Sequence, residues 1–193
     1  MNQVYVYIGR FQIPHVGHES VMKHALGNCD HLVLLVGSSE GGRTTKNPFT
    51  FEERKEMLAQ ITDGFKNNRK VSVLSLPDFA TDEEWTNEVQ KLVTSVTETD
   101  DKIFITGCRK TGDESTYYLQ LFPDWHSDFI SEVSFSGIDV ISSTKARELF
   151  YKGEEIPDFV SPSVKGCLQM FKEKELFIFE SLVESLNAKR LKI

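Results

Sequence analysis

Residues 9–18 of the chain read Gly-Arg-Phe-Gln-Ile-Pro-His-Val-Gly-His, and this stretch decides the fold. It follows residues 4–8, a β-branched and aromatic run that is typical of a buried strand. It precedes residues 21–26, whose apolar positions recur at helical spacing. Gly9 allows a tight turn after the strand, and Gly17 allows another group to approach the first turn of the helix. Such a strand–turn–helix unit presents free backbone N–H groups to an anion.

Three basic side chains fall at this predicted turn. Arg10, His15 and His18 add hydrogen-bond donors to those of the helix N-terminus. The spacing of the two histidines can aim both imidazole rings at one ligand, so the stretch predicts a phosphate site. Two histidines three residues apart are also common as incidental surface residues, and the pair alone leaves that alternative open.

The composition indicates a globular protein with free thiols. Its 193 residues suit one domain, or one domain with an extension, and a hydrophobic content of 39% is sufficient for a core. The net charge of −7 argues against broad binding to nucleic acids or membrane surfaces. We find neither a leader pattern nor an apolar run long enough to span a membrane. Cys29, Cys108 and Cys167 are odd in number and widely separated, which indicates reduced cysteines and a cytoplasmic location.

Strand patterns alternate with helix patterns along the first part of the chain. After residues 4–8, further strands are expected at residues 31–37, 71–76 and 102–106. Thr50 and Thr81 are expected to cap the helices that lie between these strands. This alternation predicts an α/β fold with a doubly wound parallel sheet, in which ligands bind at the carboxyl ends of the strands. Polar segments follow each expected strand, at residues 9–18, 38–47, 77–82 and 107–115.

A second motif, Ile-Ser-Ser-Thr-Lys-Ala-Arg, occupies residues 141–147. Hydroxyl groups at a predicted helix N-terminus and Arg147 one turn further on would form a second anion-binding cradle. An ordinary Ser/Thr cap with a solvated arginine is the alternative. One or two short strands are expected before this motif, within residues 133–141, and the chain from residue 161 onward predicts helices.

The two motifs, in this order, resemble the HxGH and ISSTxxR motifs of the nucleotidylyltransferase superfamily. Three further segments resemble the NadM type of nicotinamide-nucleotide adenylyltransferase within it. They are Lys-Asn-Pro-Phe-Thr-Phe-Glu-Glu-Arg at residues 46–54, the pair Asp82-x-x-Trp85, and the stretch from Arg109 to Trp125. The resemblance covers about residues 3–150 and implies the Rossmann-like nucleotidylyltransferase fold.

The resemblance implies transfer of the adenylyl group of ATP to nicotinamide mononucleotide, which yields NAD and pyrophosphate. It implies three catalytic residues, His15, His18 and Arg147. It assigns contacts with ATP and its phosphates to Gly9, Arg10, Phe11, Lys46, Arg54, Ser142, Ser143 and Thr144. It assigns contacts with the nicotinamide nucleotide to Asp82, Trp85, Arg109 and Lys110. No metal site is expected in the protein, because Mg²⁺ would arrive on the ATP phosphates.

We expect residues 1–155 to form the nucleotidylyltransferase domain and residues 156–193 a helical extension packed on it. The Nudix hydrolase domain that follows in many NadM-type proteins is not expected. An apolar stripe within residues 176–186 predicts core packing or the face of a homo-oligomer. Three alternatives stay open: another acceptor, such as nicotinate mononucleotide, pantetheine phosphate or FMN; a nucleotide-sensing module without turnover; and an interaction protein that uses the C-terminal helix.

Overall fold

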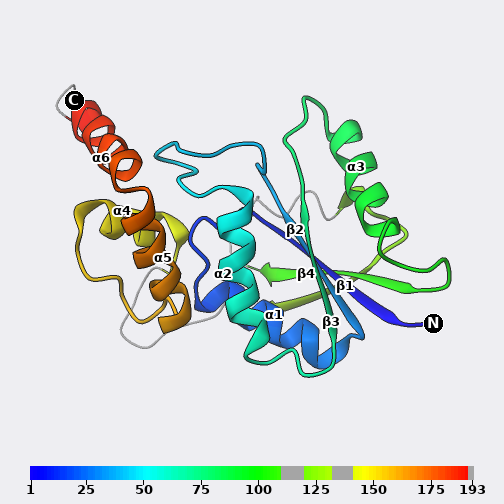
Figure 1. Cartoon of the computed structure of the whole chain (residues 1–193). Helices are drawn as coiled ribbons and strands as arrows, with labels where there is room; N and C mark the ends of the chain where they lie inside the picture. Colours follow the sequence, from blue (N-terminus) through cyan, green and yellow to red (C-terminus); the bar gives the residue numbers. More distant parts are fainter. Residues whose placement is uncertain (110–119, 132–140, 191–193) are drawn as a thin grey trace.

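The structure is a computed structural model that describes residues 1–109, 120–131 and 141–190. Within these residues, five strands form one sheet with the order β3-β2-β1-β4-β5 (Figure 1), and every neighbouring pair is parallel. The strands are β1 (Gln3–Gly9), β2 (His31–Val36), β3 (Lys70–Ser75), β4 (Lys102–Arg109) and β5 (His126–Ser131). This order is doubly wound, and it reverses between β1 and β4, where such sheets bind ligands.

Helices cover both faces of the sheet. They are α1 (Val16–Asn28), α2 (Phe51–Asp63), α3 (Asp82–Thr94), α4 (Ser143–Lys152), α5 (Pro162–Lys174) and α6 (Leu176–Arg190). Helices α1 and α2 pack on one face, whereas Val89 and Val93 of α3 belong to the apolar cluster on the other. Helix α5 packs against α2, and α6 contacts α4 and α5, so these helices extend the α1–α2 layer on one side (Figure 1). None of the described helices is long and apolar enough to cross a membrane.

The predicted doubly wound fold is confirmed, and the differences lie at the ends of elements. Helix α1 runs to Asn28, so Gly27 is not its cap; Cys29, a buried residue, takes that position. Strand β4 extends to Arg109, three residues beyond the predicted end, because β5 pairs with its last residues. Strand β5 was not predicted from the sequence, because its residues are mostly polar and only Asp128, Phe129 and Ile130 among them are half-buried. The strands predicted within residues 133–141 lie outside the described residues, apart from Ile141.

The predicted caps and the C-terminal helices appear in the structure. Thr50 accepts a hydrogen bond from the backbone N–H of Glu53, and Thr81 accepts one from Glu84. In the apolar stripe of α6, Phe179 and Leu182 are buried in the main core, while Phe177 is 81% exposed. The boundary between residues 155 and 156 stays a prediction, because the same core holds side chains from both sides of it.

Asp128 connects the edge strand β5 to the centre of the sheet. One of its carboxylate oxygens accepts a hydrogen bond from the Tyr5 hydroxyl at 2.6 Å and lies 2.9 Å from His24 Nε2. Burial raises the pKa of Asp128, but the hydrogen bonds from Tyr5 and His24 lower it by a larger amount. The pKa of Asp128 therefore lies below its ordinary value. The folded state therefore favours the carboxylate form.

We expect the substitution Asp128→Asn to lower the free energy of unfolding by about 1–3 kcal/mol at neutral pH, because Tyr5 and His24 then donate to a neutral acceptor in place of a charged one. The contribution of Asp128 is present above its ordinary pKa and disappears as the pH falls through the depressed folded-state pKa. The deficit should therefore shrink in urea denaturation curves recorded at successively lower pH. Asp63→Asn, in an exposed pair with Lys66, is the matched control. A deficit that does not change with pH would contradict the assignment.

Candidate active site

Two histidines begin helix α1 at the carboxyl end of β1. The backbone N–H of Gly17 donates to His15 Nδ1 at 3.2 Å, and the N–H of His15 donates to His18 Nδ1 at 3.2 Å. Their ring centroids are 3.9 Å apart. Because both Nδ1 atoms accept hydrogen bonds, the neutral rings carry their protons on Nε2. The helix N-terminus therefore selects the tautomer in which each Nε2 is a donor.

Two glycines allow close packing around these histidines: Gly9 at the end of β1, and Gly17 between the two histidines. Phe11 has a φ of +50° and is 1% exposed, and its ring lies over Gly9, where a Cβ atom would come within 2.8 Å of it. A Cβ atom at Gly17 would lie 3.1 Å from the His15 ring. The Phe11 ring meets the His18 ring edge-on, with centroids 5.1 Å apart. Phe11 thus packs against His18, while its predicted contact with ATP stays a prediction.

The second motif docks on the backbone of the first. Ser143 Oγ donates to the carbonyl oxygen of Ile13 at 2.8 Å, and Arg147 donates to the carbonyl oxygen of Gln12 and to Thr144 Oγ1. Ser142 caps α4, as its Oγ accepts from the backbone N–H of Lys145. The sequence analysis placed both motifs at anion sites, and the structure holds these two helix N-termini together across 130 residues of sequence.

Positive charge gathers beside these motifs. Burial lowers the pKa of Arg147, Tyr151 opposes that shift, and the positive charge of Arg10 adds to it. Burial also lowers the pKa of Arg54 to about 10; the carboxylate of Asp78 opposes that shift, and the positive charge of Arg10 adds to it. Arg10 is exposed, and its side chain forms no ion pair with any residue that the structure describes. Mutual repulsion among these guanidinium groups makes the site favourable for a polyanion.

Arg54 is a fully buried arginine on α2 that holds the loops around the site. Its guanidinium donates to three carbonyl oxygens, those of Arg10 at 2.8 Å, Gly37 at 2.7 Å and Ser38 at 3.1 Å. Its Nε donates to the carbonyl oxygen of Thr50. In this structure Arg54 positions the ends of β1 and β2, and its predicted contact with phosphate stays a prediction.

Gln12 is a buried link that the sequence analysis missed. Its side-chain amide donates to the carbonyl oxygen of Phe49 at 2.9 Å and accepts from the N–H of Phe49 at 3.1 Å. The side chain is 2% exposed. The amide therefore joins the turn after β1 to the loop between β2 and α2, here called the β2–α2 loop (residues 37–50). A polar residue between Phe11 and Ile13 was the signal that could have revealed it.

Lys46 lies on the β2–α2 loop and is exposed. The structure gives it no ion pair with another described residue. Among the residues described, no group of three or more His, Cys, Asp or Glu side chains is placed to hold a metal ion.

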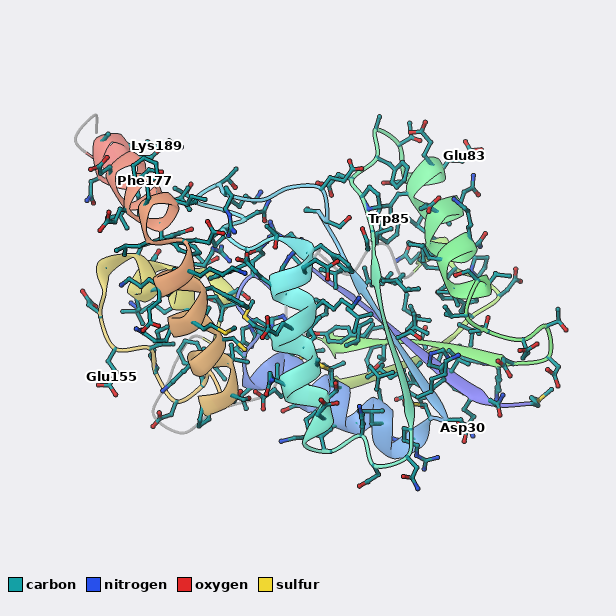
Figure 2. All side chains as sticks on the ribbon, in the orientation of Figure 1. Asp30, Glu83, Trp85, Glu155, Phe177 and Lys189 are labelled. Atoms are coloured by element: carbon teal, nitrogen blue, oxygen red, sulfur yellow. The ribbon has the colours of Figure 1, made fainter. Side chains whose placement is uncertain are left out.

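The residues assigned to the pyridine nucleotide are only partly described. Asp82 is the first residue of α3 and is exposed, and Trp85 lies in the first turn, as predicted. The half-buried Trp85 (Figure 2) packs against the apolar cluster under α3, with its ring 6.0 Å from that of Phe122. The backbone of Arg109 ends β4 and its side chain is not described, whereas Lys110 lies outside the described residues.

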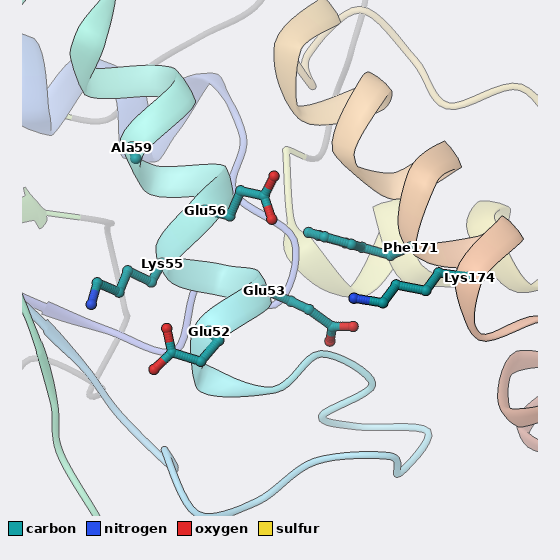
Figure 3. Close-up of a pocket in the computed structure, with 7 residues that line it drawn as sticks. All are labelled: Glu52, Glu53, Lys55, Glu56, Ala59, Phe171 and Lys174. Carbon is teal, nitrogen blue, oxygen red and sulfur yellow. The ribbon is translucent and has the colours of Figure 1, made fainter.

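A groove of about 410 Å³ lies between α2 and α5 and does not involve the two motifs (Figure 3). Its lining is mostly charged: Glu52, Glu53, Lys55, Glu56, Ala59, Phe171 and Lys174. None of these residues was predicted to bind substrate, so the groove is separate from the predicted site.

Histidines and two helix N-termini at the carboxyl edge of a doubly wound parallel sheet define a nucleotide-binding α/β protein. The sequence pattern of the cytidylyltransferase-like family matches residues 6–149, and the chain belongs to that family. A relative from Acinetobacter baylyi, named nicotinamide/nicotinic acid mononucleotide adenylyltransferase, is 30% identical over 172 residues, 89% of this chain and 88% of the relative. The nicotinamide-nucleotide adenylyltransferase of Thermococcus onnurineus is 29% identical over 88% of this chain and 84% of its own length.

A solved structure from Francisella tularensis shares the fold. It is a bifunctional NMN adenylyltransferase/ADP ribose pyrophosphatase that matches with a TM-score of 0.81 and 28% identity. The match covers 99% of this chain and 56% of that protein, so the chain spans little more than half of it. A second structure of the Francisella protein is complexed with AMP and a Mn ion.

We expect Gln12→Glu to lower the free energy of unfolding by about 1–3 kcal/mol at neutral pH, because the carbonyl oxygen of Phe49 loses its donor. An introduced carboxyl group becomes a donor again when protonated, so the deficit should shrink as the pH falls. Urea denaturation at several pH values measures both effects. Gln60→Glu, on the exposed side of α2, is the control. Equal stability of the Gln12→Glu variant and the wild type at neutral pH would contradict the link.

Proposed function

We propose that the chain transfers the adenylyl group of ATP to nicotinamide mononucleotide and produces NAD and pyrophosphate. The observation that carries the proposal is the docking of α4 on the turn before α1, through Ser143 and Arg147, which brings the N-termini of these two helices together beside His15 and His18. The names and coverage of the Acinetobacter and Thermococcus relatives support this reaction in particular.

In the proposed reaction, a phosphate oxygen of the mononucleotide attacks the α-phosphorus of ATP in line. A new P–O bond forms as the bond from the α-phosphorus to the bridging oxygen breaks, and pyrophosphate leaves with the electron pair. The attacking phosphate is already ionised at neutral pH, so no general base is needed. Catalysis then depends on positioning and on stabilising the negative charge of the transition state.

The described residues suit these two tasks. The Nε2–H groups of His15 and His18 would donate to the phosphate oxygens, because the helix N-terminus has selected that tautomer. Arg10 and Arg147 would hold the leaving pyrophosphate portion, with Lys46 reaching in from the β2–α2 loop. Ser142, Ser143 and Thr144 would supply the hydroxyl and N–H groups of the second cradle.

The divalent metal belongs to the substrate in this proposal. The Francisella protein is complexed with AMP and a Mn ion, which supports a divalent ion accompanying the nucleotide. We propose Mg²⁺ bound to the ATP phosphates, since Mg²⁺ commonly binds through substrate phosphates rather than through a protein cage.

Nicotinate mononucleotide is a second candidate acceptor, because the name of the Acinetobacter relative includes nicotinic acid mononucleotide. Trp85 could discriminate between the two. A pyridinium ring stacked on indole gains about 0.5–2 kcal/mol from cation–π attraction, which the added carboxylate of the nicotinate would oppose. We therefore propose nicotinamide mononucleotide as the preferred acceptor.

The test of the proposed function is pyrophosphate release from ATP with each acceptor in turn. We expect release with nicotinamide mononucleotide and little or none with pantetheine phosphate or FMN, and NAD should be identified as the product. Trp85→Ala should raise the KM for the pyridine acceptor by about 2- to 30-fold if the ring stacks on the substrate. An unchanged KM would assign Trp85 to core packing alone, and absence of release with either pyridine nucleotide would refute the function.

We expect His18→Ala to lower kcat by about 100-fold or more, the usual loss when one preorganised transition-state donor is removed. The fold should remain, since the hydrogen bond that the ring accepts from the N–H of His15 lies at the N-terminus of α1 and not within the sheet. His126→Ala, at the exposed start of β5, is the matched histidine control. Steady-state kinetics with ATP and nicotinamide mononucleotide measure the effect, and a kcat close to that of the control would remove His18 from the catalytic set.

A further inference from the structure

Arg43 of the β2–α2 loop contacts three separate elements. Its guanidinium forms two hydrogen bonds with the carboxylate of Glu53 on α2, at 2.9 and 3.0 Å. Its Nη2 lies 3.7 Å from Glu175, and its guanidinium carbon lies 5.6 Å from the centre of the Phe179 ring. Arg43 also donates to the carbonyl oxygen of Pro48 within its own loop. One side chain thus joins the loop, α2 and the junction between α5 and α6.

The contact with Glu175 lies at the junction between α5 and α6. Glu175 caps the end of α5, and its carbonyl oxygen accepts from the N–H groups of Ile178 and Phe179 in the first turn of α6. Figure 3 shows Glu53, near the start of α2, opposite Lys174 at the end of α5. The start of α2 and the α5–α6 junction therefore approach each other, and Arg43 bridges them.

Two more contacts attach the same loop to helices α4 and α6. The hydroxyl of Tyr151, on α4, donates to the carbonyl oxygen of Thr45 at 3.0 Å. The buried Phe49 ring packs against the ring of Phe179, with centroids 5.6 Å apart. These contacts lie on both sides of Lys46 in the sequence, so they restrict where its ammonium group can reach. Figure 1 shows the loop extending from β2 toward the start of α6 before it returns to α2.

The conformation of Arg43 itself depends on these partners. Its φ is +60°, in the left-handed region that favours glycine. A glycine such as the neighbouring Gly42 could adopt this conformation without cost, whereas the Cβ atom of Arg43 makes it strained. The bidentate pair with Glu53 and the aromatic face of Phe179 offset the strain, because a planar guanidinium can serve both at once. A lysine cannot reproduce this arrangement.

We propose that Arg43 is a positioning residue for ATP, and that the α5–α6 junction acts through it to hold Lys46 at the nucleotide phosphates. The inference rests on the proposed function and adds to it a role for the C-terminal helices. Arg43 does not touch the substrate in this proposal. Its effect on the reaction passes through the β2–α2 loop and therefore through Lys46.

The kinetic signature of Arg43→Ala is a rise in the KM for ATP of about 10-fold, as expected when a charged contact with phosphate is lost. The kcat and the KM for nicotinamide mononucleotide should stay within about twofold of the wild type, since uniform binding of ATP alone is weakened. Arg43→Lys keeps the positive charge but loses the planar, bidentate guanidinium. Its KM for ATP should lie between those of the wild type and Arg43→Ala.

A double-substitution cycle separates positioning from general stabilisation. Lys46→Ala should raise the KM for ATP about as much as Arg43→Ala, and the double variant should be little worse than either single one, because both remove the same contact. Additive effects of the two substitutions on the KM for ATP would overturn the proposal.

Equilibrium binding of ATP without acceptor distinguishes failure of this inference from failure of the proposed function. If the wild type binds ATP but adenylates no pyridine nucleotide, the proposed function is refuted. The Kd values of the variants for ATP would still test the role of Arg43. Glu175→Gln, which removes only the 3.7 Å pair, provides the same comparison should Arg43→Ala not fold. Arg69→Ala removes an ion pair with Asp30 near the amino end of β3 and is the matched control. An ATP Kd unchanged from this control in folded Arg43 or Glu175 variants would refute the inference.

Discussion

The carbonyl oxygens of the turn between β1 and α1 need hydrogen-bond donors, and the rest of the site depends on how this need is met. Arg54 binds the carbonyl of Arg10, Arg147 binds that of Gln12, and Ser143 binds that of Ile13. A buried carbonyl without a donor costs about 1–3 kcal/mol, so these contacts strongly restrict the turn. Two guanidinium groups buried for this purpose also bring positive charge beside the histidines. The same contacts that stabilise the turn therefore make it attractive to phosphate.

Much of this arrangement could be predicted from the sequence, because it depends on local signals. A β-branched strand, glycine at the turn and a capped helix predicted the first motif, and Ser142 predicted the start of the second. Alternation of strands and helices then placed both at one edge of a parallel sheet. What the sequence does not reveal is which side chains bind backbone atoms far away. Gln12 and Arg54 are ordinary polar residues until the fold brings Phe49 and Gly37 beside them.

Strand β5 is a second feature that could not be predicted from the sequence. Residues His126–Ser131 have no continuous apolar run, and β4 is their one pairing strand within the part of the chain that the structure describes. Asp128 lies there among partners from β1 and α1, a combination that no spacing rule could have predicted. The predicted division at residue 155 rests on the extent of the family resemblance and on the helical pattern that begins at residue 161. In the structure, one apolar core includes side chains of α1, α2, α4, α5 and α6, on both sides of this division, which stays a prediction.

The donors that hold the turn bind main-chain oxygens, which every amino acid possesses. Replacing the side chains of residue 13 or residue 38 by others of suitable size would leave the bonds from Ser143 and Arg54 intact. The framework is thus largely independent of the side chains that project from it. Such a scaffold can change its ligand preference through single substitutions without first losing its shape, and this separation favours divergence of specificity from one ancestral architecture.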